Sequence, residues 1–330
     1  MAICLQTPKN AKEDIDVPSS IERTIDCNEK IVLPSLIDCH VHFRTPGQEH
    51  KEDWRTGTAA AVAGGVTTIL DMPNNTPGTT EQTVINQKKA IAQKTALCNY
   101  GFFLGATSYN QQAIESIRHA IALKVYVGSS TGNLLVTEKK ALEKVFAAAK
   151  KRGLPVCVHA EDEKIIQQNT QLAKQQNWNH ARFHNKIRTE EAEALAIQTC
   201  LKLQQEIGNQ LHVCHLTSAV GLELVEEAKN AFPDLLLTCE VTPNHLFLTE
   251  ENTEQMENFA KINPSLKTKK DQQALWKGIQ RGIVDCVATD HAPHTVSEKM
   301  KSYWEAPSGM TGIETMIALL ADAVQEERLD

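Results

Sequence analysis

The sequence predicts an α/β protein of the closed (β/α)8 class, the TIM barrel, and two observations support this fold. Short apolar runs recur eight times along the chain, and segments with helical periodicity separate them. Alternating strands and helices indicate parallel βαβ units, and eight of them favour a closed barrel over an open doubly wound sheet. The 330 residues suffice for one large α/β domain or two ordinary ones, each with a substantial core.

The predicted strands are apolar runs of strand length, half of which end in a polar or ionisable residue. In chain order they are IVLPSLIDCHVH (31–42), VTTILDM (66–72), NYGFFL (99–104), ALKVYV (122–127), LPVCVH (154–159), LHVCH (211–215), LLLTCEV (235–241) and VDCVATD (284–290).

The clearest predicted helices end at glycine, which commonly stops a helix. They are KEDWRTGTAAAVAGG (51–65), TEKKALEKVFAAAKKRG (137–153) and EEAEALAIQTCLKLQQEIG (190–208), and TGIETMIALLADAVQEERL (311–329) is the predicted eighth helix. The longest irregular stretches are predicted at 177–184 and 295–308. Long loops on a compact barrel are more often functional than accidental.

Composition and charge exclude several classes of protein. Hydrophobic residues at 41% and charged residues at 23% are typical of a soluble globular protein, and a net charge of −7 gives no reason to expect nucleic acid as a partner. No apolar run reaches the length of about 18 residues that a membrane span needs, and the first residues lack a signal-peptide pattern. Nine scattered cysteines are typical of free thiols in a reducing compartment, so a cytoplasmic protein is predicted.

The first predicted strand ends in a His-x-His pair. Alternate side chains of a strand share a face, so His40 and His42 are expected to point one way and Cys39 and Val41 the other. Cys39 is therefore interpreted as a packing residue. Two imidazoles on one face suit a metal ion, but an isolated pair is equally compatible with polar residues at the end of a strand. The other strand ends decide between these interpretations.

The remaining strand ends are rich in ligating and acid–base side chains. Active sites of barrels lie at the carboxyl ends of the strands, so these residues should converge on one rim. They are Arg44 after the first strand, Asp71, Pro73 and Asn74 after the second, Lys124 in the fourth, His159, Glu161 and Asp162 after the fifth, His215 after the sixth, His245 after the seventh, and Asp290, His291 and His294 after the eighth. This convergence predicts a metal site.

Nitrogen and oxygen ligands without thiolates favour zinc, and two neighbouring ions sharing a hydroxide would hydrolyse an amide or ester bond. Asp290 is the candidate general base, a role compatible with that of a plain ligand. Lys124 is a poor ligand as an ammonium, but carbamylation by carbon dioxide would make it an anionic bridge between two metals. The alternative is a lysine that extends its tip to solvent.

The motifs together resemble one known family. LIDCHVHFRTPG, DMPNN, CVHAED, HVCHLTSA, EVTPNHLFL, KINPSLK, VATDHAPH and PSGMTGIET follow, in order from Ile31 to Thr315, the pattern of the dihydroorotases of the amidohydrolase superfamily. The resemblance implies the reversible zinc-dependent cyclisation of N-carbamoyl-L-aspartate to L-dihydroorotate in de novo pyrimidine biosynthesis.

The resemblance also implies roles for individual residues. The metal ligands would be His40, His42 and Asp290 for one zinc and His159 and His215 for the other, with carboxylated Lys124 and a hydroxide as bridges. The substrate would be held by Arg44, Asn74, Asn263 and His294, and by the loop at Ser308 and Gly309. A guanidinium also matches a carboxylate on physical grounds, because its planar donor fork fits two oxygens.

The chain departs from the family pattern at Thr45, where an aspartate is usual, at Asn244, and at Ser265 and Lys267. The family also carries a small β-sandwich built from both chain ends, and here it is expected to be truncated or missing. Residues 1–30 are thus predicted to be a short N-terminal segment, a remnant of that sandwich, and residues 31–330 a metal-dependent hydrolase barrel.

Three alternatives stay open at this point. Allantoinase and dihydropyrimidinase share the barrel and the two-metal chemistry, and some dihydroorotase-like chains are non-catalytic partners of aspartate transcarbamoylase. The last alternative is disfavoured because every expected ligand position holds a ligating residue. The resemblance allows a homodimer and an association with aspartate transcarbamoylase. His184 and His212, among other histidines, are interpreted as surface or packing residues.

Overall fold

A computed structural model describes residues 32–128 and 134–329. A compact unit begins at Ser35 and contains every described strand and helix. The predicted N-terminal segment, residues 1–30, lies outside the described residues, so the proposed domain boundary stays a prediction.

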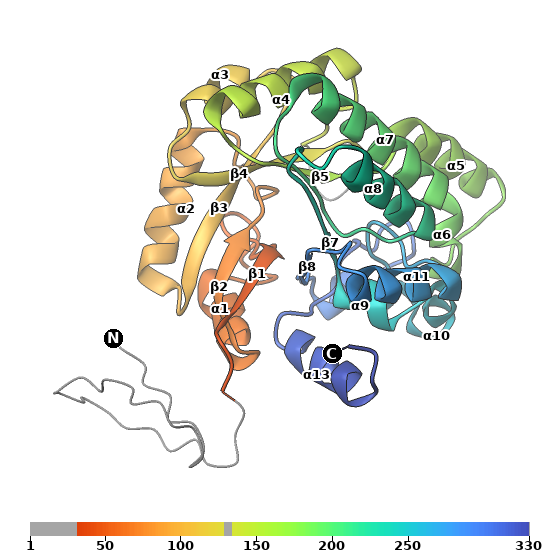
Figure 1. Cartoon of the computed structure of the whole chain (residues 1–330). Coiled ribbons are helices and arrows are strands. Elements are labelled where there is room, and N and C mark those ends of the chain that lie inside the picture. Colours follow the sequence, from red (N-terminus) through yellow and green to blue (C-terminus); the bar gives the residue numbers. More distant parts are fainter. Residues whose placement is uncertain (1–31, 129–133, 330) are drawn as a thin grey trace, which may run out of the picture. The chain divides into compact units, whose positions relative to one another are not determined.

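The unit is built around parallel strands that follow the sequence order (Figure 1). In the described part of the chain the sheet has eight strands, each hydrogen-bonded to the next, in the order β1 to β8. The β-bridge between Val41 and His291 joins the first strand to the chain just after the last, so the predicted barrel is confirmed. The strands are β1 (Leu36–Val41), β2 (Val66–Asp71), β3 (Asn99–Gly105), β4 (Ala120–Tyr126), β5 (Val156–His159), β6 (Leu211–Val213), β7 (Leu237–Val241) and β8 (Cys286–Val287).

Helices separate the strands and surround the barrel (Figure 1). The α-helices are α1 (Trp54–Ala63), α2 (Gln82–Thr95), α3 (Gln111–Ser116), α4 (Lys139–Arg152), α5 (Glu163–Gln175), α6 (His184–Ile187), α7 (Glu190–Ile207), α8 (Ala219–Ala231), α9 (Pro243–Phe247), α10 (Thr253–Met256), α11 (Lys269–Gln280), α12 (Val296–Lys299) and α13 (Met316–Gln325). The 3-10 helices are η1 (Ala181–Phe183), η2 (Glu250–Asn252) and η3 (Glu257–Ala260).

The helix ends follow from local chemistry. Asp53 caps α1 by accepting a hydrogen bond from the Thr56 amide, and Thr189 caps α7 in the same way through the Ala192 amide. Gly153 and Gly208 end α4 and α7 with φ angles of 73° and 74°, a left-handed conformation that glycine adopts without strain.

The structure differs from the sequence prediction in the last helix and in the stretches predicted as irregular. The last helix begins at Met316 and not at residue 311. The stretches predicted as irregular contain short helices: η1 and the start of α6 lie in 177–184, and α12 lies in 295–308. These segments are too short to show a helical period, so the sequence gives no sign of them.

The hydrophobic core has two layers. The larger layer packs the outward faces of the strands against the helices, and it includes Val41, Ile69 and Phe146. A much smaller cluster fills the barrel interior with Met72, Phe103 and a few smaller side chains. The rest of the interior is therefore available to polar and ionisable groups.

The barrel is least regular where β7, β8 and β1 meet, a region called the seam below. Only two residue pairs join β7 to β8, and the pairing of β1 with β2 shifts register between Asp38 and Val41, as at a β-bulge. The prediction that Cys39 points away from His40 is wrong, because both side chains contact Glu240. A bulge adds a residue to a strand and so breaks the alternation on which the prediction rested.

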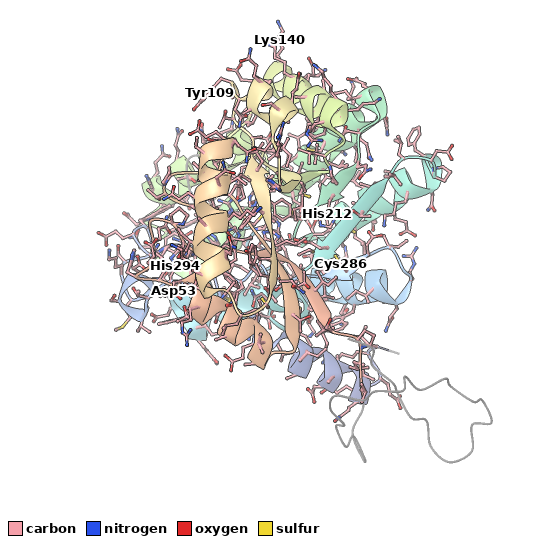
Figure 2. All side chains as sticks on the ribbon, turned by 90° about the vertical axis from the view of Figure 1, so that its left-hand side faces the viewer. Asp53, Tyr109, Lys140, His212, Cys286 and His294 are labelled. Carbon is pink, nitrogen blue, oxygen red and sulfur yellow. The ribbon has the colours of Figure 1, made fainter. Side chains whose placement is uncertain are left out.

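In Figure 2, the seam lies apart from the chain that follows β8. Cys286 and His212 lie together on one side of the molecule, and His294, which follows β8, lies on the other (Figure 2).

Among the described residues, no helix combines the length and the apolar character that a membrane crossing requires. The cysteines of this part of the chain are all free thiols.

Candidate metal centre and substrate pocket

One pocket opens at the carboxyl ends of the strands and brings the predicted site residues together. It is lined by His40, His42, Arg44, Asn74, Lys124, Tyr126, His159, His215, Asn263, Asp290, Ala292, Ser308 and Gly309. Eleven of the twelve residues predicted for the site are among them, and His294 lies directly behind Arg44. The residues come from six strands or strand ends, so their meeting is a property of the closed barrel.

The first half of the centre is formed by His40, His42 and Asp290. The Asp290 carboxylate oxygen Oδ1 lies 2.9 Å from His42 Nε2 and 3.3 Å from His40 Nε2. Asp290 has a φ of 47°, a left-handed conformation that is costly for a residue with a Cβ atom. Such strain is typical of residues that the surrounding fold holds in place for function.

The second half is formed by His159 and His215, with Lys124 between the halves. His159 Nδ1 and His215 Nε2 are 3.0 Å apart, and His215 also has a left-handed φ, 35°. The Lys124 amine lies 3.5 Å from His40 Nε2 and is fully buried. Burial by itself lowers the pKa of this amine, but the neighbouring Cys214, Tyr126 and Glu240 outweigh burial and raise the pKa above its usual value. We call these six residues, His40, His42, Lys124, His159, His215 and Asp290, the rim cluster.

Three of the four histidines present one particular nitrogen to the centre, because other residues hold the opposite nitrogen, whereas the buried Nδ1 of His215 has no hydrogen-bond partner among the described residues. Glu240 accepts from His40 Nδ1 in a short contact, and the Asn74 side-chain oxygen lies 2.6 Å from His42 Nδ1. Glu161 Oε2 lies 2.7 Å from His159 Nε2. Such partners fix the tautomer and the ring orientation of metal-ligating histidines. The nitrogens left for a cation are Nε2 of His40 and His42 and Nδ1 of His159.

Sequence reasoning missed the residues behind this layer. Arg188 is buried and donates from Nε to both oxygens of Glu161, at 3.1 and 3.0 Å. Lys267 and Ser265, two departures from the family pattern, both donate to the Arg188 carbonyl oxygen. The Glu161 carboxylate that holds His159 is therefore itself held in place. Arg188 lies between α6, a helix of four residues, and α7, and it belongs to none of the sequence motifs.

The donor set fits divalent cations. Ligands about 2.0–2.2 Å from a tetrahedral zinc ion lie about 3.4 Å from one another. The observed separations in the rim cluster, 2.9 to 3.3 Å between Asp290 and the first two histidines and 3.0 Å between His159 and His215, are close to this spacing. Imidazole nitrogens with a carboxylate form a typical zinc donor set, and the residues therefore fit a pair of metal ions.

The protonation states also suit a cation. Burial lowers the pKa of His42 to about 4 and lowers the pKa of His159 below its usual value. These rings are therefore neutral at pH 7, as metal binding requires. Burial by itself raises the pKa of Asp290, but the neighbouring His40 and His42 outweigh it and hold this pKa far below its usual range. Asp290 is thus an anion.

Arg44 forms the wall of the pocket that faces the rim cluster. Its guanidinium is 2% exposed, and its Nε donates to the Pro293 carbonyl oxygen at 3.0 Å. Its Nη2 lies 3.1 Å from His294 Nε2, which in turn lies 3.0 Å from the Ser308 carbonyl oxygen. The buried positive charge makes this wall complementary to an anionic group of a ligand.

Asn263 and Gly309 complete the pocket. The Asn263 side-chain oxygen lies 2.9 Å from Nε2 of His184, which is buried, in keeping with a packing role. A Cβ atom on Gly309 would come within 2.5 Å of the Ala292 carbonyl oxygen, so only glycine fits there. The Gly309 amide donates to the Lys261 carbonyl, and its carbonyl accepts from Lys299.

Three further residues at strand ends face away from the centre. Asp71 forms an ion pair with Lys88 of α2 and accepts from the Phe43 amide. His291 contacts Glu52 at 2.9 Å, and His245 contacts Thr242 and the Pro264 carbonyl. They anchor the rim to the surrounding chain and do not line the pocket.

Comparison with known proteins agrees with this arrangement. The profile of the Amidohydrolase family matches residues 31–329. A dihydroorotase of Methanosarcina mazei is 38% identical over 317 residues, which are 94% of this chain and 69% of that protein. The multifunctional protein CAD of Squalus acanthias is 36% identical over 308 residues, 93% of this chain and 12% of that protein.

Among solved structures, the L-hydantoinase (dihydropyrimidinase) from Arthrobacter aurescens superimposes with a TM-score of 0.90 at 27% identity. The match covers 94% of this chain and 70% of that one. A D-hydantoinase superimposes with a TM-score of 0.82 at 23% identity and supports the fold alone.

Proposed function

Because the chain belongs to the amidohydrolase family, we propose that it is a dihydroorotase, which interconverts L-dihydroorotate and N-carbamoyl-L-aspartate. The relatives named dihydroorotase support this substrate, at 33–38% identity over most of the chain. The observation that carries the proposal is Arg44, a buried guanidinium in the wall of the pocket that contains the rim cluster. Dihydroorotate differs from uncharged cyclic amides by its carboxylate, and a guanidinium is the side chain best suited to bind that group.

In this proposal the rim cluster holds two zinc ions. His40, His42 and Asp290 would hold one, His159 and His215 the other, and Lys124, carboxylated by carbon dioxide, would bridge them. When bound, the ions supply Lewis acidity toward the amide carbonyl. They also lower the pKa of a water molecule, so that it loses a proton readily and can attack the carbonyl carbon. Lys124 is fully buried, so a carbamate neutralised by the two ions would take the place of a buried ammonium.

The protein groups then orient the substrate and move one proton. Arg44 and Asn74 hold the substrate carboxylate, so that the ring amide lies over the rim cluster. Asp290 accepts a proton from the attacking water and returns it to the ring nitrogen as the carbon–nitrogen bond breaks. In the direction of synthesis, Asp290 takes the proton from the carbamoyl nitrogen that attacks the side-chain carboxyl group, and water leaves.

A second candidate is a hydantoinase or dihydropyrimidinase, favoured by the TM-score of 0.90 with the Arthrobacter aurescens enzyme. The two candidates share the metal centre and differ in the group beside the ring. A pocket for an uncharged ring does not need a buried arginine, because an unpaired charge in the pocket would weaken binding.

The test is a side-by-side assay of the zinc-loaded protein with L-dihydroorotate, allantoin and dihydrouracil. We expect kcat/KM for dihydroorotate to exceed the other two values by about tenfold to a hundredfold, since a charge-assisted pair contributes about 1.5–3 kcal/mol. A preference for dihydrouracil would establish the second candidate. A chain that binds zinc stoichiometrically but hydrolyses none of the three would support the non-catalytic alternative.

A further inference from the structure

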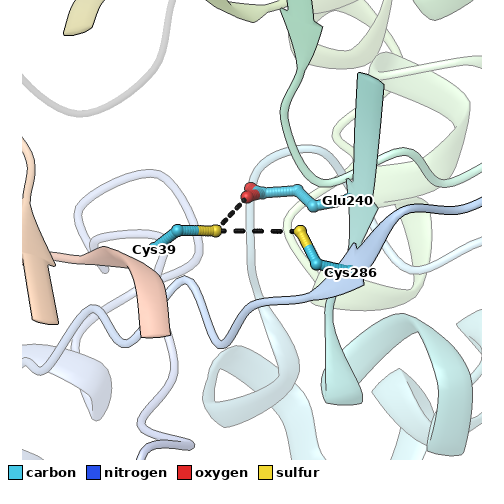
Figure 3. A group of neighbouring side chains, drawn as sticks. All are labelled: Cys39, Glu240 and Cys286. Carbon is cyan, nitrogen blue, oxygen red and sulfur yellow. Dashed lines mark hydrogen bonds between the residues drawn. The ribbon is translucent and has the colours of Figure 1, made fainter. Parts of the chain in front are cut away.

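A second group of potential ligands lies at the seam, away from the pocket. Cys39 in β1, Glu240 in β7 and Cys286 in β8 point toward one another from three strands (Figure 3). Their ligand atoms all lie within 4.8 Å of one another. We call these three residues the seam cluster. None of them lines the substrate pocket, and the proposed reaction uses none of them.

The distances in the seam cluster match a tetrahedral metal site. Two sulfurs bound to one zinc ion at about 2.3 Å and at a tetrahedral angle lie about 3.8 Å apart. The Cys39 and Cys286 sulfurs are 3.8 Å apart, and Cys39 Sγ lies 3.3 Å from Glu240 Oε2. A disulfide would need a separation of about 2.05 Å, so the observed spacing suits a shared cation better than a direct bond.

Glu240 has a separate oxygen for each cluster. Its Oε1 faces His40 Nδ1 and the His215 amide, whereas its Oε2 faces Cys39 and, at 3.1 Å, His212 Nε2. Binding at Oε2 therefore leaves the support of the rim cluster intact. His212, interpreted as a surface or packing residue, contacts Glu240 and does not line the pocket.

We propose that the seam cluster binds a thiophilic divalent cation such as zinc. The cation would bond to Cys39 Sγ, Cys286 Sγ and Glu240 Oε2, the two thiol protons would pass to solvent, and water would take the fourth position. Two thiolates favour zinc, cobalt or cadmium over magnesium or calcium. The cation would join β1, β7 and β8, which the backbone joins weakly, since only two residue pairs connect β7 with β8.

Cobalt provides a direct test because a thiolate–cobalt bond gives a strong near-ultraviolet charge-transfer absorption that histidine and carboxylate ligands do not. The metal-depleted protein, kept reduced, is titrated with Co²⁺. We expect the parent protein to show this absorption. Cys39→Ser and Cys286→Ser should each bind the ion more than about tenfold more weakly. The double variant should show no absorption. The weaker visible bands of cobalt at the rim cluster should persist in all three variants, which shows that they fold.

Two further cysteine variants serve as controls. Cys200→Ser changes a buried thiol of α7 and should leave the absorption unchanged. Cys214→Ser is needed because the Cys214 thiol lies with His40 and Glu240 in another group of potential ligands. The proposal expects the absorption to survive Cys214→Ser. It is overturned if the absorption disappears in Cys214→Ser and survives in the double variant, or if the parent protein shows none.

Oxidation is the competing explanation for two close thiols. A Cys39–Cys286 disulfide in peptides of the protein purified under air, together with no cobalt absorption after reduction, would replace the cation site with a redox pair. None of these readouts depends on turnover of dihydroorotate. A failure of the proposed function and a failure of the seam site are therefore distinguishable.

Discussion

The rim cluster and the seam cluster begin on neighbouring residues of β1, His40 and Cys39, yet they differ in almost every other respect. The rim cluster has nitrogen and oxygen donors, lines a pocket and is supported by buried hydrogen bonds. The seam cluster has two sulfurs, lines no part of that pocket and joins strands that pair poorly. One carboxylate, Glu240, therefore contacts both kinds of cluster, each through a different oxygen.

The largest difference between the clusters should be in catalysis. Asp290→Asn removes the proposed base, which is expected to lower kcat for dihydroorotate by about a thousandfold, within the usual range for general acid–base groups. The matched control is Asp322→Asn, which removes the same charge from an exposed position of α13. The seam absorption of cobalt should be unchanged in both variants. Normal turnover by Asp290→Asn would refute the assigned role.

The second largest effect should be on the binding of the substrate carboxylate by Arg44. Arg44→Met should raise KM for dihydroorotate by about a hundredfold, because it removes a charge-assisted pair from a buried wall, and should change KM for dihydrouracil little. Arg55→Met, on the exposed face of α1, is the control for loss of an arginine. Equal losses with both substrates would mean that Arg44 shapes the pocket and does not select the carboxylate.

Glu240 is the residue that connects the two clusters. Glu240→Gln should weaken cation binding at both, by about tenfold to a hundredfold at the rim, as is usual when a partner of a metal-ligating histidine is replaced. Asn74→Ala should weaken cation binding at the rim, because the Asn74 side-chain oxygen lies 2.6 Å from His42 Nδ1, and should leave the seam absorption of cobalt unchanged. Competition titrations with a chelator measure both affinities. If Glu240→Gln alters only one of the clusters, the carboxylate does not serve both.

Acid should lower the free energy of unfolding, because His245, close to the rim, is buried and neutral in the folded protein. Burial lowers the pKa of His245 from 6.5 to about 4. The unfolded chain therefore binds a proton there first, and stability falls as the pH drops from about 6.5 to about 4. The slope contributed by this group approaches about 1 kcal/mol per pH unit.

The measurement is the free energy of unfolding of the metal-free protein at several pH values, for the parent chain and for His245→Gln. The variant should lose part of the pH dependence and keep its stability near neutrality to within about 2 kcal/mol, since glutamine can still donate to the Pro264 carbonyl oxygen. Identical slopes for the two chains would show that His245 does not titrate in this range.

Most of the rim cluster could be predicted from the sequence, for a physical reason. His40, His159, His215 and Asp290 each end a recognisable strand, and parallel strands of a barrel bring their carboxyl ends to one rim. Their positions therefore follow from the strand count without any knowledge of packing. The placement of Lys124 in the same pocket follows from the same rule.

The seam cluster could not be predicted in this way. A register shift in β1 turns Cys39 toward Glu240, and the sequence around LIDCHVH carries no sign of it. Glu240 and Cys286 pair across β7 and β8, whereas Cys39 lies 201 and 247 residues away from them in the chain. Arg188 was missed for a related reason, since the helices between strands decide where it points.

The most direct test of the account is anomalous diffraction at the zinc absorption edge from crystals of the zinc-loaded protein. We predict one peak among His40, His42 and Asp290, a second between His159 and His215, continuous density joining the Lys124 amine to both, and a separate peak between Cys39 and Cys286. An empty rim, in a protein that nevertheless turns over dihydroorotate, would contradict the central claim that these residues form a metal-dependent hydrolytic centre.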